Sequence, residues 1–158
     1  MREHIRESNL IESIDDPAED KRSRWAWKWF IQQPKITTEV LFELHRRITL
    51  KQLQASVRGK YRPCQVWVGR HVPMPPAEVP VAMNLYLNQL NHHWSIFDPI
   101  AMHVEFETIH PFIDGNGRTG RMLLWWHQIQ LGEEPTLFRA AERWEQYYPL
   151  FNRETVAK

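Results

Sequence analysis

The strongest constraint on the fold of this chain is the twelve-residue stretch 110–121, HPFIDGNGRTGR. An apolar segment, residues 99–109, precedes the stretch, and a second apolar run follows it directly. Pro111 prevents the first segment from continuing as a regular helix, and the glycines permit a tight turn with close approach of a ligand to the backbone. The pattern therefore predicts a helix, a turn and a second helix over residues 99–131, with the polar residues gathered in the turn.

The residues of this turn are suited to binding phosphate. A glycine-rich turn that enters a helix directs backbone N–H groups at one point, where the helix dipole adds positive potential. Arg118 and Arg121 follow on the first turn of the second helix, and guanidinium groups bind phosphate in a bidentate manner. Asp114 can hold Mg²⁺ beside phosphates, and His110 can act as a base near neutral pH. Each residue alone has a structural explanation, but together they indicate a phosphate-handling site beside a base.

The remaining segments predict a single, mainly α domain that spans residues 1–158. A short, irregular β-hairpin is expected at residues 57–70, where Gly59 and Gly69 bracket a segment of valines and aromatic residues. About seven helices are expected in all, including the two flanking the turn. The other five are expected at about residues 3–14, 18–33, 38–50, 80–91 and 138–153, from their apolar spacing, caps and proline boundaries.

Two expectations concern individual side chains on these helices. His45 lies on the apolar stripe of the third helix, and we expect it to be packed and hydrogen-bonded rather than to bind a ligand. In the second helix, Trp25 and Trp29 are four residues apart and are expected on its buried face. Trp27 falls off that face, so we expect it to be exposed and available to an interface.

The composition narrows the class of protein. The 158 residues suit one domain, and the net charge of +1 gives no global field for binding nucleic acid. No apolar run approaches the length of a membrane span. The single cysteine, Cys64, excludes an internal disulfide, and the N-terminus lacks the apolar core of a signal peptide. We therefore expect a cytoplasmic protein that binds neither nucleic acid nor membrane, although a protein exported by a specialised secretion system would look the same.

The stretch 110–121 resembles the signature of the Fic (filamentation induced by cAMP) family, H-P-F-x-[D/E]-G-N-G-R-x-x-R, with every specified position matched. The resemblance covers most of the chain from about residue 38 to 150 and implies a Fic-type helical bundle. Residues that resemble the helix before the motif are Ala101, His103, Phe106, Glu107 and Ile109. Residues that resemble the hairpin "flap" of the family are Gly59, Tyr61, Arg62, Gln65, Val66, Trp67 and Gly69.

The resemblance implies a nucleotidyltransferase that moves AMP from ATP to a Ser, Thr or Tyr hydroxyl of a target protein or of itself. It implies that His110 deprotonates the hydroxyl and that Asp114 holds Mg²⁺ against the α- and β-phosphates. Flap residues would align an extended target segment by adding it as a strand. These residues are Tyr61, Arg62, Gln65, Val66 and Trp67.

The same resemblance implies a role for each phosphate-binding residue. Asn116 and the amides around Gly115 and Gly117 would hold oxygens of the α- and β-phosphates. Arg118 would bind the β-phosphate and Arg121 the γ-phosphate. Positioning and charge stabilisation of this kind account for most of the catalysis in phosphoryl transfer.

The N-terminal segment, residues 1–16, is a candidate inhibitory helix. Its sequence from Ser8 to Ser13 resembles the family's inhibitory motif, [S/T]-x-x-x-E-[G/N], in which the glutamate pairs with the second arginine. Here that pair would be Glu12 with Arg121. The departure from the motif is Ser13, where relatives carry Gly or Asn. The resemblance thus implies an auto-inhibited protein adenylyltransferase.

Two alternatives to an auto-inhibited adenylyltransferase are compatible with these residues. In some relatives the same glutamate serves removal of AMP, so the first alternative is a de-AMPylase that uses Glu12. The second is a non-catalytic nucleotide-binding or interaction module, against which the intact His110 argues. The target protein and the oligomeric state, including a possible homo-oligomer that controls the inhibitory helix, are not determined by these patterns.

Overall fold

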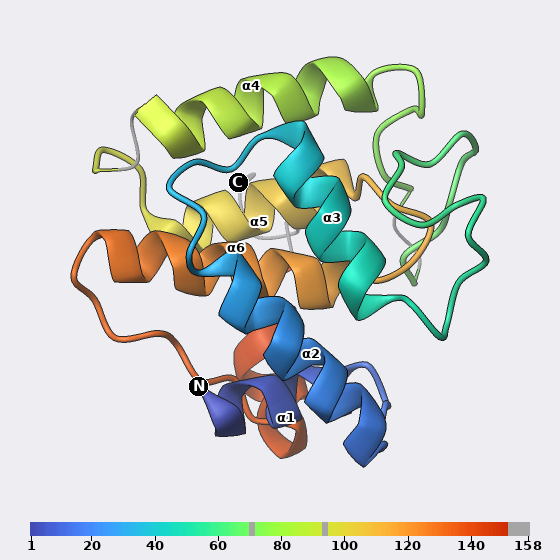
Figure 1. Ribbon diagram of the computed structural model, residues 1–158. Coiled ribbons are helices and arrows are strands. Elements are labelled where there is room, and N and C mark those ends of the chain that lie inside the picture. Colours follow the sequence, from blue (N-terminus) through green and yellow to red (C-terminus); the bar gives the residue numbers. More distant parts are fainter. Residues whose placement is uncertain (70–71, 93–94, 152–158) are drawn as a thin grey trace.

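The computed structural model describes residues 1–69, 72–92 and 95–151, and within them the fold is built of helices (Figure 1). Six of these are α-helices, and a seventh helical region follows at residues 140–151. The α-helices are α1 (Arg2–Ile11), α2 (Pro17–Phe30), α3 (Thr38–Ile48), α4 (Val79–His92), α5 (Pro99–Ile109) and α6 (Asn116–Gln130).

The last helical region is not one regular helix. It consists of the 3₁₀ turn η1 (Ala140–Glu142), the π-helical turn η2 (Arg143–Tyr147) and the 3₁₀ turn η3 (Tyr148–Phe151). A single helix was expected at residues 138–153, of which 152 and 153 lie outside the described residues. Pro149 lies in η3 and has no N–H to donate, which is incompatible with a regular helix through this region.

The helices α5 and α6 form the centre of the domain. They pack against each other, with α4 on one side of α5 and with α1 and α3 against α6 (Figure 1). Asp98 begins α5 by accepting a hydrogen bond from the amide of Ala101 at 2.7 Å, and Pro99 occupies the first turn. Nearly every residue of α6 from Arg118 to Gln128 is buried. The turn between these two helices is therefore held inside a rigid frame.

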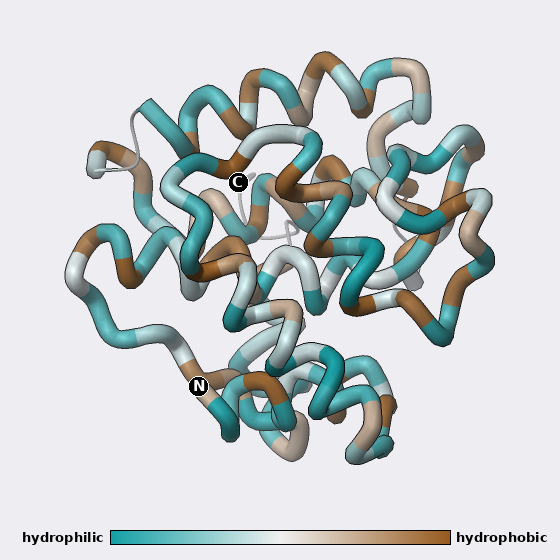
Figure 2. Tube along the Cα trace, in the orientation of Figure 1, coloured by the Kyte–Doolittle hydropathy of each residue, from teal (hydrophilic) through white to brown (hydrophobic). Residues whose placement is uncertain are grey.

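The surrounding helices each present one side to this centre. Figure 2 shows hydrophobic and hydrophilic residues alternating along α4, as expected of a helix with one buried face. Within the described residues, the buried apolar side chains form one continuous core. Its largest side chains include Phe30, Tyr86, Phe106, Phe112 and Trp125.

The expectation for the second helix was wrong at two tryptophans. Trp27 is buried, whereas Trp25 is 67% exposed. Trp27 packs edge-on against Trp125 of α6, with ring centroids 5.8 Å apart, and also against Phe30. In a helix this rich in aromatic residues, spacing alone does not decide which face is buried, and the packing partner on α6 does.

The hairpin expected at residues 57–70 is not confirmed. No strand occurs among the described residues: 57–69 form turns, bends and irregular backbone, with Val68 alone in a β-bridge; Arg70 lies outside them. Pro63 removes one backbone donor from the segment. The side chains of Arg62 and Gln65 bind backbone carbonyl groups of residues 64, 73, 74, 109 and 110 instead. We refer to residues 57–69 as the flap segment.

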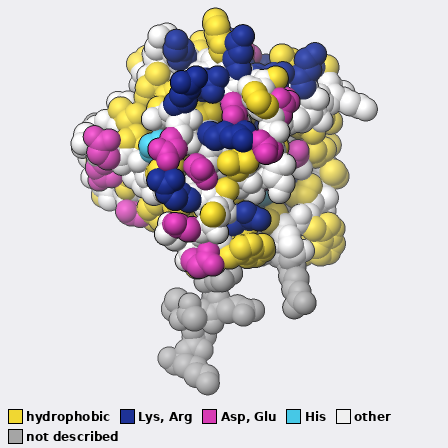
Figure 3. Space-filling model, turned by 90° about the horizontal axis from the view of Figure 1, so that it is seen from below, with side chains coloured by type: hydrophobic (Ala, Val, Ile, Leu, Met, Phe, Trp, Pro, Cys, Tyr) yellow, Lys and Arg dark blue, Asp and Glu magenta, His cyan; other side chains and the backbone are white. Residues whose placement is uncertain are grey.

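The molecular surface carries mixed charge on the side seen from below in Figure 1. Basic and acidic side chains both occur across this face in Figure 3, without a band of one sign. None of the described helices combines the length and apolar character needed to cross a lipid bilayer.

Candidate active site

His110 stands at the point where α5 ends. Its φ of 50° is in the left-handed region, and its N–H donates to the carbonyl of Phe106 at 2.9 Å. Pro111 follows and cannot donate to the helix, so the chain turns away here. The side chain of His110 is 15% exposed. Burial lowers its pKa to about 4, against the opposing effect of the Glu107 carbonyl, and the nearby guanidinium of Arg62 lowers it further. The ring is therefore neutral at pH 7 and able to accept a proton.

The loop after His110 is braced from within. The side chain of Asn116 accepts a hydrogen bond from the amide of Phe112 and donates one to its carbonyl, each at 2.9 Å. Asn116 is buried, and this pair of bonds occupies its side chain. Of the residues proposed to bind phosphate, Asn116 therefore contributes its backbone, while its side chain fixes the shape of the loop.

His45 braces the same loop from α3. The amide of Gly59 donates to its Nδ1 at 2.8 Å, so the ring proton is on Nε2, which lies 2.8 Å from the carbonyl of Asp114. The ring is stacked on Phe112, with centroids 3.9 Å apart. The expectation of a packed, hydrogen-bonded histidine is confirmed. His45 therefore links α3, the flap segment and the loop between α5 and α6 (residues 110–115), which we call the motif loop.

The N-terminus of α6 is not capped by a side chain of the described residues and can bind an anion. Gly115 precedes it with φ 79°, and no described side chain caps the first turn. The free N–H groups and the helix dipole together favour a negative group at this position. A carboxylate already lies there: a Cβ at Gly117 would collide with Glu12 of α1. Glycine at this position thus allows close approach of an anionic group to the backbone.

Arg121 is buried and holds that carboxylate. Its Nη2 lies 2.6 Å from Glu12 Oε1 and 3.0 Å from the carbonyl of Ser8, and its Nε donates to Ser8 Oγ at 2.8 Å. The pair Glu12–Arg121 and the contact with Ser8 are thus present. The guanidinium also lies over the ring of Tyr147, 4.9 Å from its centroid. Arg121 Nη1 is buried without a hydrogen-bond partner among the described residues and lies against Gly117, which leaves one donor directed at the open helix end.

Arg118 points toward a different neighbour. It is buried, its Nη1 donates to the carbonyl of Ile48 at the end of α3 at 3.1 Å, and its Nε has no partner among the described residues. Burial lowers the pKa of Arg118, while Asp114 and Glu12 raise it. The two arginines, both on α6, therefore extend in different directions, Arg118 toward α3 and Arg121 toward α1.

Asp114 is exposed at the mouth of the turn. One of its carboxylate oxygens accepts a hydrogen bond from the amide of Gly115 at 2.6 Å. The described residues hold no cluster of three or more His, Cys, Asp or Glu that would ligate a metal by themselves. A single carboxylate fits Mg²⁺, which is commonly held by one or two carboxylates together with phosphate oxygens and water.

Two further residues of the site were not predicted. Glu107 lies one helical turn before His110, with 3.7 Å between its Oε2 and His110 Nδ1, too long for a hydrogen bond. Burial raises the pKa of Glu107 to about 8, despite Arg121, so the carboxyl group is largely neutral at pH 7. Tyr147 comes from η2, and its hydroxyl lies 3.1 Å from His103 Nε2. The i,i+3 spacing to His110 marks Glu107 in the sequence, but nothing local marks Tyr147.

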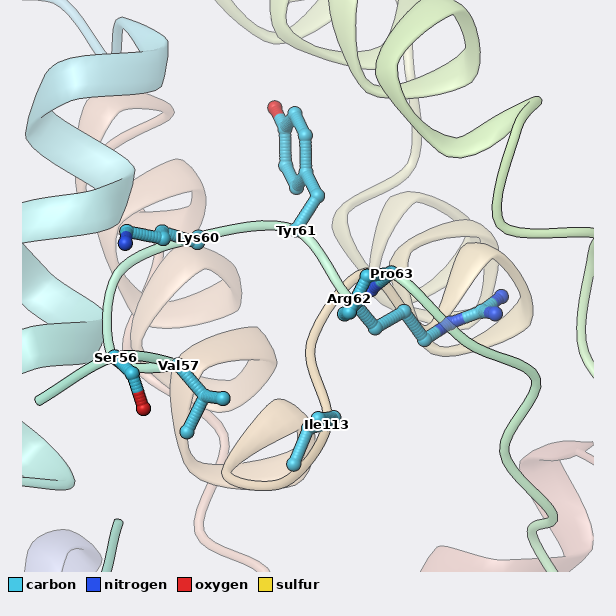
Figure 4. A pocket seen from close by; sticks show the side chains of 7 residues that line it. All are labelled: Ser56, Val57, Lys60, Tyr61, Arg62, Pro63 and Ile113. Carbon is cyan, nitrogen blue, oxygen red and sulfur yellow. The ribbon is translucent and has the colours of Figure 1, made fainter. Parts of the chain in front are cut away.

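The five flap residues proposed to dock a target do not share one orientation. Tyr61 packs on Phe42, with centroids 4.7 Å apart, and Trp67 is 71% exposed. Gln65 donates to the carbonyl of Pro73 at 2.8 Å, and Val66 is half-buried. Arg62 points inward, toward the end of α5 and away from Lys60 and Tyr61 (Figure 4). The flap side chains open to solvent are therefore those near Trp67.

A shallow pocket lies beside the flap segment, with a volume of about 140 Å³. Figure 4 shows its lining, to which Ile113 of the motif loop contributes from the side opposite Lys60 and Tyr61. The motif loop and the flap segment thus border a common hollow in the surface.

These features define a class of protein: a helical domain with an anion site at a helix N-terminus, two buried arginines and a neutral histidine close by. Comparison with known proteins specifies the family. The model of the Fic/DOC family matches residues 35–128. The chain belongs to the Fic/DOC family.

Relatives and solved structures agree with this assignment. The chain is 34% identical over 123 residues to protein adenylyltransferase Fic of Drosophila virilis, and 36% identical over 123 residues to that of Drosophila grimshawi. These matches cover 75% of this chain and 25% of each relative, so the chain spans about a quarter of the length of the curated relatives it matches.

The fold is also that of solved Fic proteins. A Fic domain containing signaling protein from Bacteroides thetaiotaomicron superimposes with a TM-score of 0.79 at 20% identity, covering 94% of this chain and 69% of the other. Fic-1 from C. elegans superimposes with a TM-score of 0.75 at 21% identity, covering 94% and 54%. At these identities the likeness shows the fold.

Proposed function

We propose that this chain is an auto-inhibited protein adenylyltransferase that transfers AMP from ATP to a hydroxyl side chain. The observation that carries the proposal is the arrangement at the start of α6. A neutral base, His110, stands beside the N-terminus of α6, which has no side-chain cap among the described residues. Glu12, paired with Arg121, lies at this helix end in the place of an anionic ligand. The relatives named protein adenylyltransferase support the chemistry.

The transfer step uses the neutral state of His110. The imidazole accepts the proton of the target hydroxyl, and the hydroxyl oxygen forms a bond to the α-phosphorus of ATP. The bond from that phosphorus to the oxygen that bridges the α- and β-phosphates breaks, and pyrophosphate leaves. A base whose pKa lies well below 7 is present in its reactive, unprotonated form throughout the neutral range.

The phosphates would lie over the N-terminus of α6. The amides of Asn116 and Gly117, at the start of α6, supply donors there, and the unpartnered Nη1 of Arg121 supplies another, whereas the amide of Gly115 is held by Asp114. Arg118, with its free Nε, approaches from the α3 side. Preorganised donors of this kind stabilise charge that develops in the transition state without needing to reorganise. We assign Arg118 to the β-phosphate and Arg121 to the γ-phosphate.

Asp114 is the residue that would hold Mg²⁺. Its exposed carboxylate stands at the edge of the proposed phosphate site, and one of its oxygens is held in place by the amide of Gly115. Bound there, the ion would neutralise charge on the phosphate oxygens and on the leaving pyrophosphate.

The inhibitory part of the proposal rests on competition for one site. Glu12 holds Arg121 Nη2, and its carboxylate lies where a Cβ on Gly117 would be. A γ-phosphate that needs Arg121 would meet a like charge at close range, which is unfavourable in a partly buried site. Glu12 is 36% exposed in its side chain, so it can move away without unfolding the core.

The target is proposed to bind along the flap segment as an extended chain. The exposed Trp67 and the half-buried Val66 are the side chains available to contact it. A hairpin in this segment, with a strand for the target to pair with, is part of the proposal. Serine, threonine and tyrosine all offer the hydroxyl that His110 would deprotonate.

The test is transfer of AMP in the Glu12→Gly variant. With ATP and Mg²⁺, intact-mass analysis should show added AMP groups on the variant and few or none on the wild type. Labelling no stronger in the variant than in the wild type would contradict auto-inhibition. The double variant Glu12→Gly with His110→Ala should lose the added mass, and persistent labelling would remove His110 from the role of base.

A second function uses the same glutamate in reverse. The partly exposed Glu12 faces the motif and raises the pKa of His110 electrostatically, so its carboxylate is close enough to act on a water molecule at the site. In that case the wild type would release AMP from a modified protein and Glu12→Gly would not. Equal release by both proteins would remove Glu12 from that role.

A further inference from the structure

Arg62 is a buried arginine with an unusual set of partners. It is 2% exposed, and its guanidinium donates to backbone carbonyl groups alone among the residues that the structure describes. The Nε lies 2.7 Å from the carbonyl of His110, Nη1 lies 3.1 Å from that of Cys64, and Nη2 reaches those of Met74 and, at 3.4 Å, Ile109. Its backbone amide also donates to the carbonyl of Pro111 at 2.9 Å.

The charge of Arg62 has no carboxylate partner in the described part of the chain. A buried cation without one is costly unless every donor is satisfied. Here four carbonyl groups accept from the guanidinium, and two of them, those of Ile109 and His110, lie at the C-terminus of α5, where the partial negative charge of a helix end favours a cation. The planar fork of arginine can serve carbonyls in three directions, which a lysine ammonium on a flexible stem does not reproduce.

The contact acts on the part of the backbone that positions His110. This residue has φ 50°, a conformation that costs a non-glycine residue of the order of 1 kcal/mol. Arg62 holds the two peptide groups that follow the Cα of His110: its Nε donates to the carbonyl of His110, and its backbone amide donates to the carbonyl of Pro111. Rotation of the first of these peptide groups would move the imidazole.

The same guanidinium contacts both the flap segment and the proline-rich connector that precedes α4 (residues 72–78), and so holds them beside His110. Cys64 belongs to the flap segment, and Met74 to the connector before α4. Figure 4 shows that Arg62 extends from the flap segment toward the central helices while its neighbour Tyr61 points elsewhere. One side chain therefore links the surface where a target is proposed to bind to the base that would deprotonate it.

We propose that Arg62 is a positioning residue that fixes the backbone of His110 and couples the flap segment to it. The inference rests on the proposed function, since it assigns His110 the role of base. Arg62 would then not contact the target, as the family resemblance implied, but would hold the backbone of the catalytic site in place. It also predicts that a change at Arg62 affects the transfer step rather than the binding of ATP.

The experiment compares variants in the active Glu12→Gly background. Arg62→Gln should slow the transfer of AMP to the protein itself by about 10²-fold at saturating ATP, the scale expected for a misplaced reacting group. The affinity for ATP, measured by calorimetry, should remain within about 2-fold, because the N-terminus of α6 and Arg121 are untouched. Arg62→Lys keeps the charge but not the fork and should restore only part of the rate.

The pH profile gives a readout that a merely structural role would not change. The charged or titratable groups facing His110 are Glu107 on α5, Arg62 from the flap segment, Glu12 from α1 and Asp114 from the motif loop. Loss of the Arg62 charge removes a cation that disfavours protonated His110. The acidic limb of the rate profile should therefore shift toward higher pH in Arg62→Gln and remain in place in Arg62→Lys.

The outcomes separate the two proposals. Arg47→Gln, which removes a half-buried arginine of α3 that pairs with Glu43 and lies over the ring of Trp29, away from His110, is the matched control and should transfer AMP at the rate of its parent. If Glu12→Gly itself transfers no AMP, the proposed function fails. If it does and Arg62→Gln keeps the parental rate and pH profile, the positioning role is overturned. If Arg62→Gln does not fold, Arg62→Lys decides: a folded variant with the full parental rate overturns the role.

Discussion

At the scale of single residues, Ser13 shows why the inhibitory motif favours glycine or asparagine. Ser13 has φ 61°, and its N–H and that of Ile14 close the end of α1 on the carbonyls of Leu10 and Asn9, each at 2.9 Å. This is the Schellman arrangement, in which the residue after the C-cap adopts the left-handed conformation. Glu12 is the C-cap itself. The residue that departs from the motif therefore lies in the conformation that most disfavours a Cβ.

We predict that Ser13→Gly stabilises the C-terminal end of α1 and strengthens the inhibition of AMP transfer by Glu12. Relief of the left-handed conformation should raise the free energy of unfolding by about 0.5–1 kcal/mol, after the entropy that glycine gains in the unfolded chain. If this stabilisation applies to α1 in the position where Glu12 contacts Arg121, basal AMP transfer should fall by about 2- to 5-fold. Urea unfolding and the rate of self-modification measure the two effects.

Ser13→Ala is the matched control for this substitution. Alanine keeps the Cβ, so neither the stability nor the inhibition should increase. A Ser13→Gly protein that is no more stable than Ser13→Ala would contradict the conformational explanation. A more stable protein with unchanged basal rate would show that the end of α1 does not limit release of Glu12.

At the scale of elements, α1 is attached to the domain through buried polar bonds as well as apolar contacts. Asn9 donates to Asp20 of α2 at 2.7 Å, and Ser23 Oγ lies 3.4 Å from Asn9 Oδ1. Arg6 reaches the same Asp20 at 3.1 Å and the exposed Asp15 as well. Because Asp20 is buried and Asp15 is exposed, the two carboxylates should differ in their contribution to holding α1.

We predict that Asp20→Asn loosens α1 and raises the basal rate of AMP transfer, without touching the nucleotide site. Loss of the charge-assisted bonds to Asn9 and Arg6 should cost about 1–3 kcal/mol. The resulting activity should lie between those of the wild type and Glu12→Gly. Asp15→Asn removes only an exposed ion pair, so its stability and rate should stay near the wild-type values.

Self-modification assays and hydrogen exchange of the α1 amides would measure the difference between these two variants. Faster exchange in α1 of Asp20→Asn, with the core unchanged, is the expected pattern. Equal basal rates for Asp15→Asn and Asp20→Asn would contradict the role of the buried bond.

At the scale of the whole molecule, the interior contains histidines that are held neutral. His103 is buried, and burial lowers its pKa to about 3, with Arg121 lowering it further. Because the folded value lies below the unfolded value of about 6.5, protonation favours the unfolded chain. The stability from neutral His103 is complete above about pH 6.5 and is lost as the pH falls toward the folded pKa.

We predict that the stability difference between the wild type and His103→Gln narrows as the pH falls from 7 to 4. The change should reach at most about 1.4 kcal/mol per pH unit, since the wild type takes up one extra proton on unfolding. The contribution of Glu107 to stability depends on pH in the opposite direction, because its raised pKa adds stability that is lost as the pH rises toward 8. Both proteins contain Glu107, so its contribution largely cancels in the difference between their free energies of unfolding.

Urea titrations of both proteins at several pH values would give this difference directly. A constant gap across the range would show that His103 does not take up its proton on unfolding. Ring signals of His103 in NMR spectra should likewise stay at their neutral positions down to about pH 5.

The sequence by itself determined the features that depend on neighbours along the chain. The starts of α2 and α5 follow from Asp16-Pro17 and Asp98-Pro99, where an N-cap acid precedes a proline in the first turn. The turn after His110 and the glycine-lined start of α6 follow from one continuous motif. Such features are local, because caps and backbone preferences act within a few residues.

Only the tertiary structure decided which groups meet across long separations. It turned Arg62 inward onto the backbone of His110 and brought the ring of Tyr147 against Arg121, whereas the contact of Glu12 with Arg121 had been implied by the resemblance to the inhibitory motif. It also buried Trp27 in place of Trp25. These contacts depend on which helix faces pack together. Burial in that packing keeps His110 neutral, and the neighbours brought close by the packing decide which groups each arginine contacts.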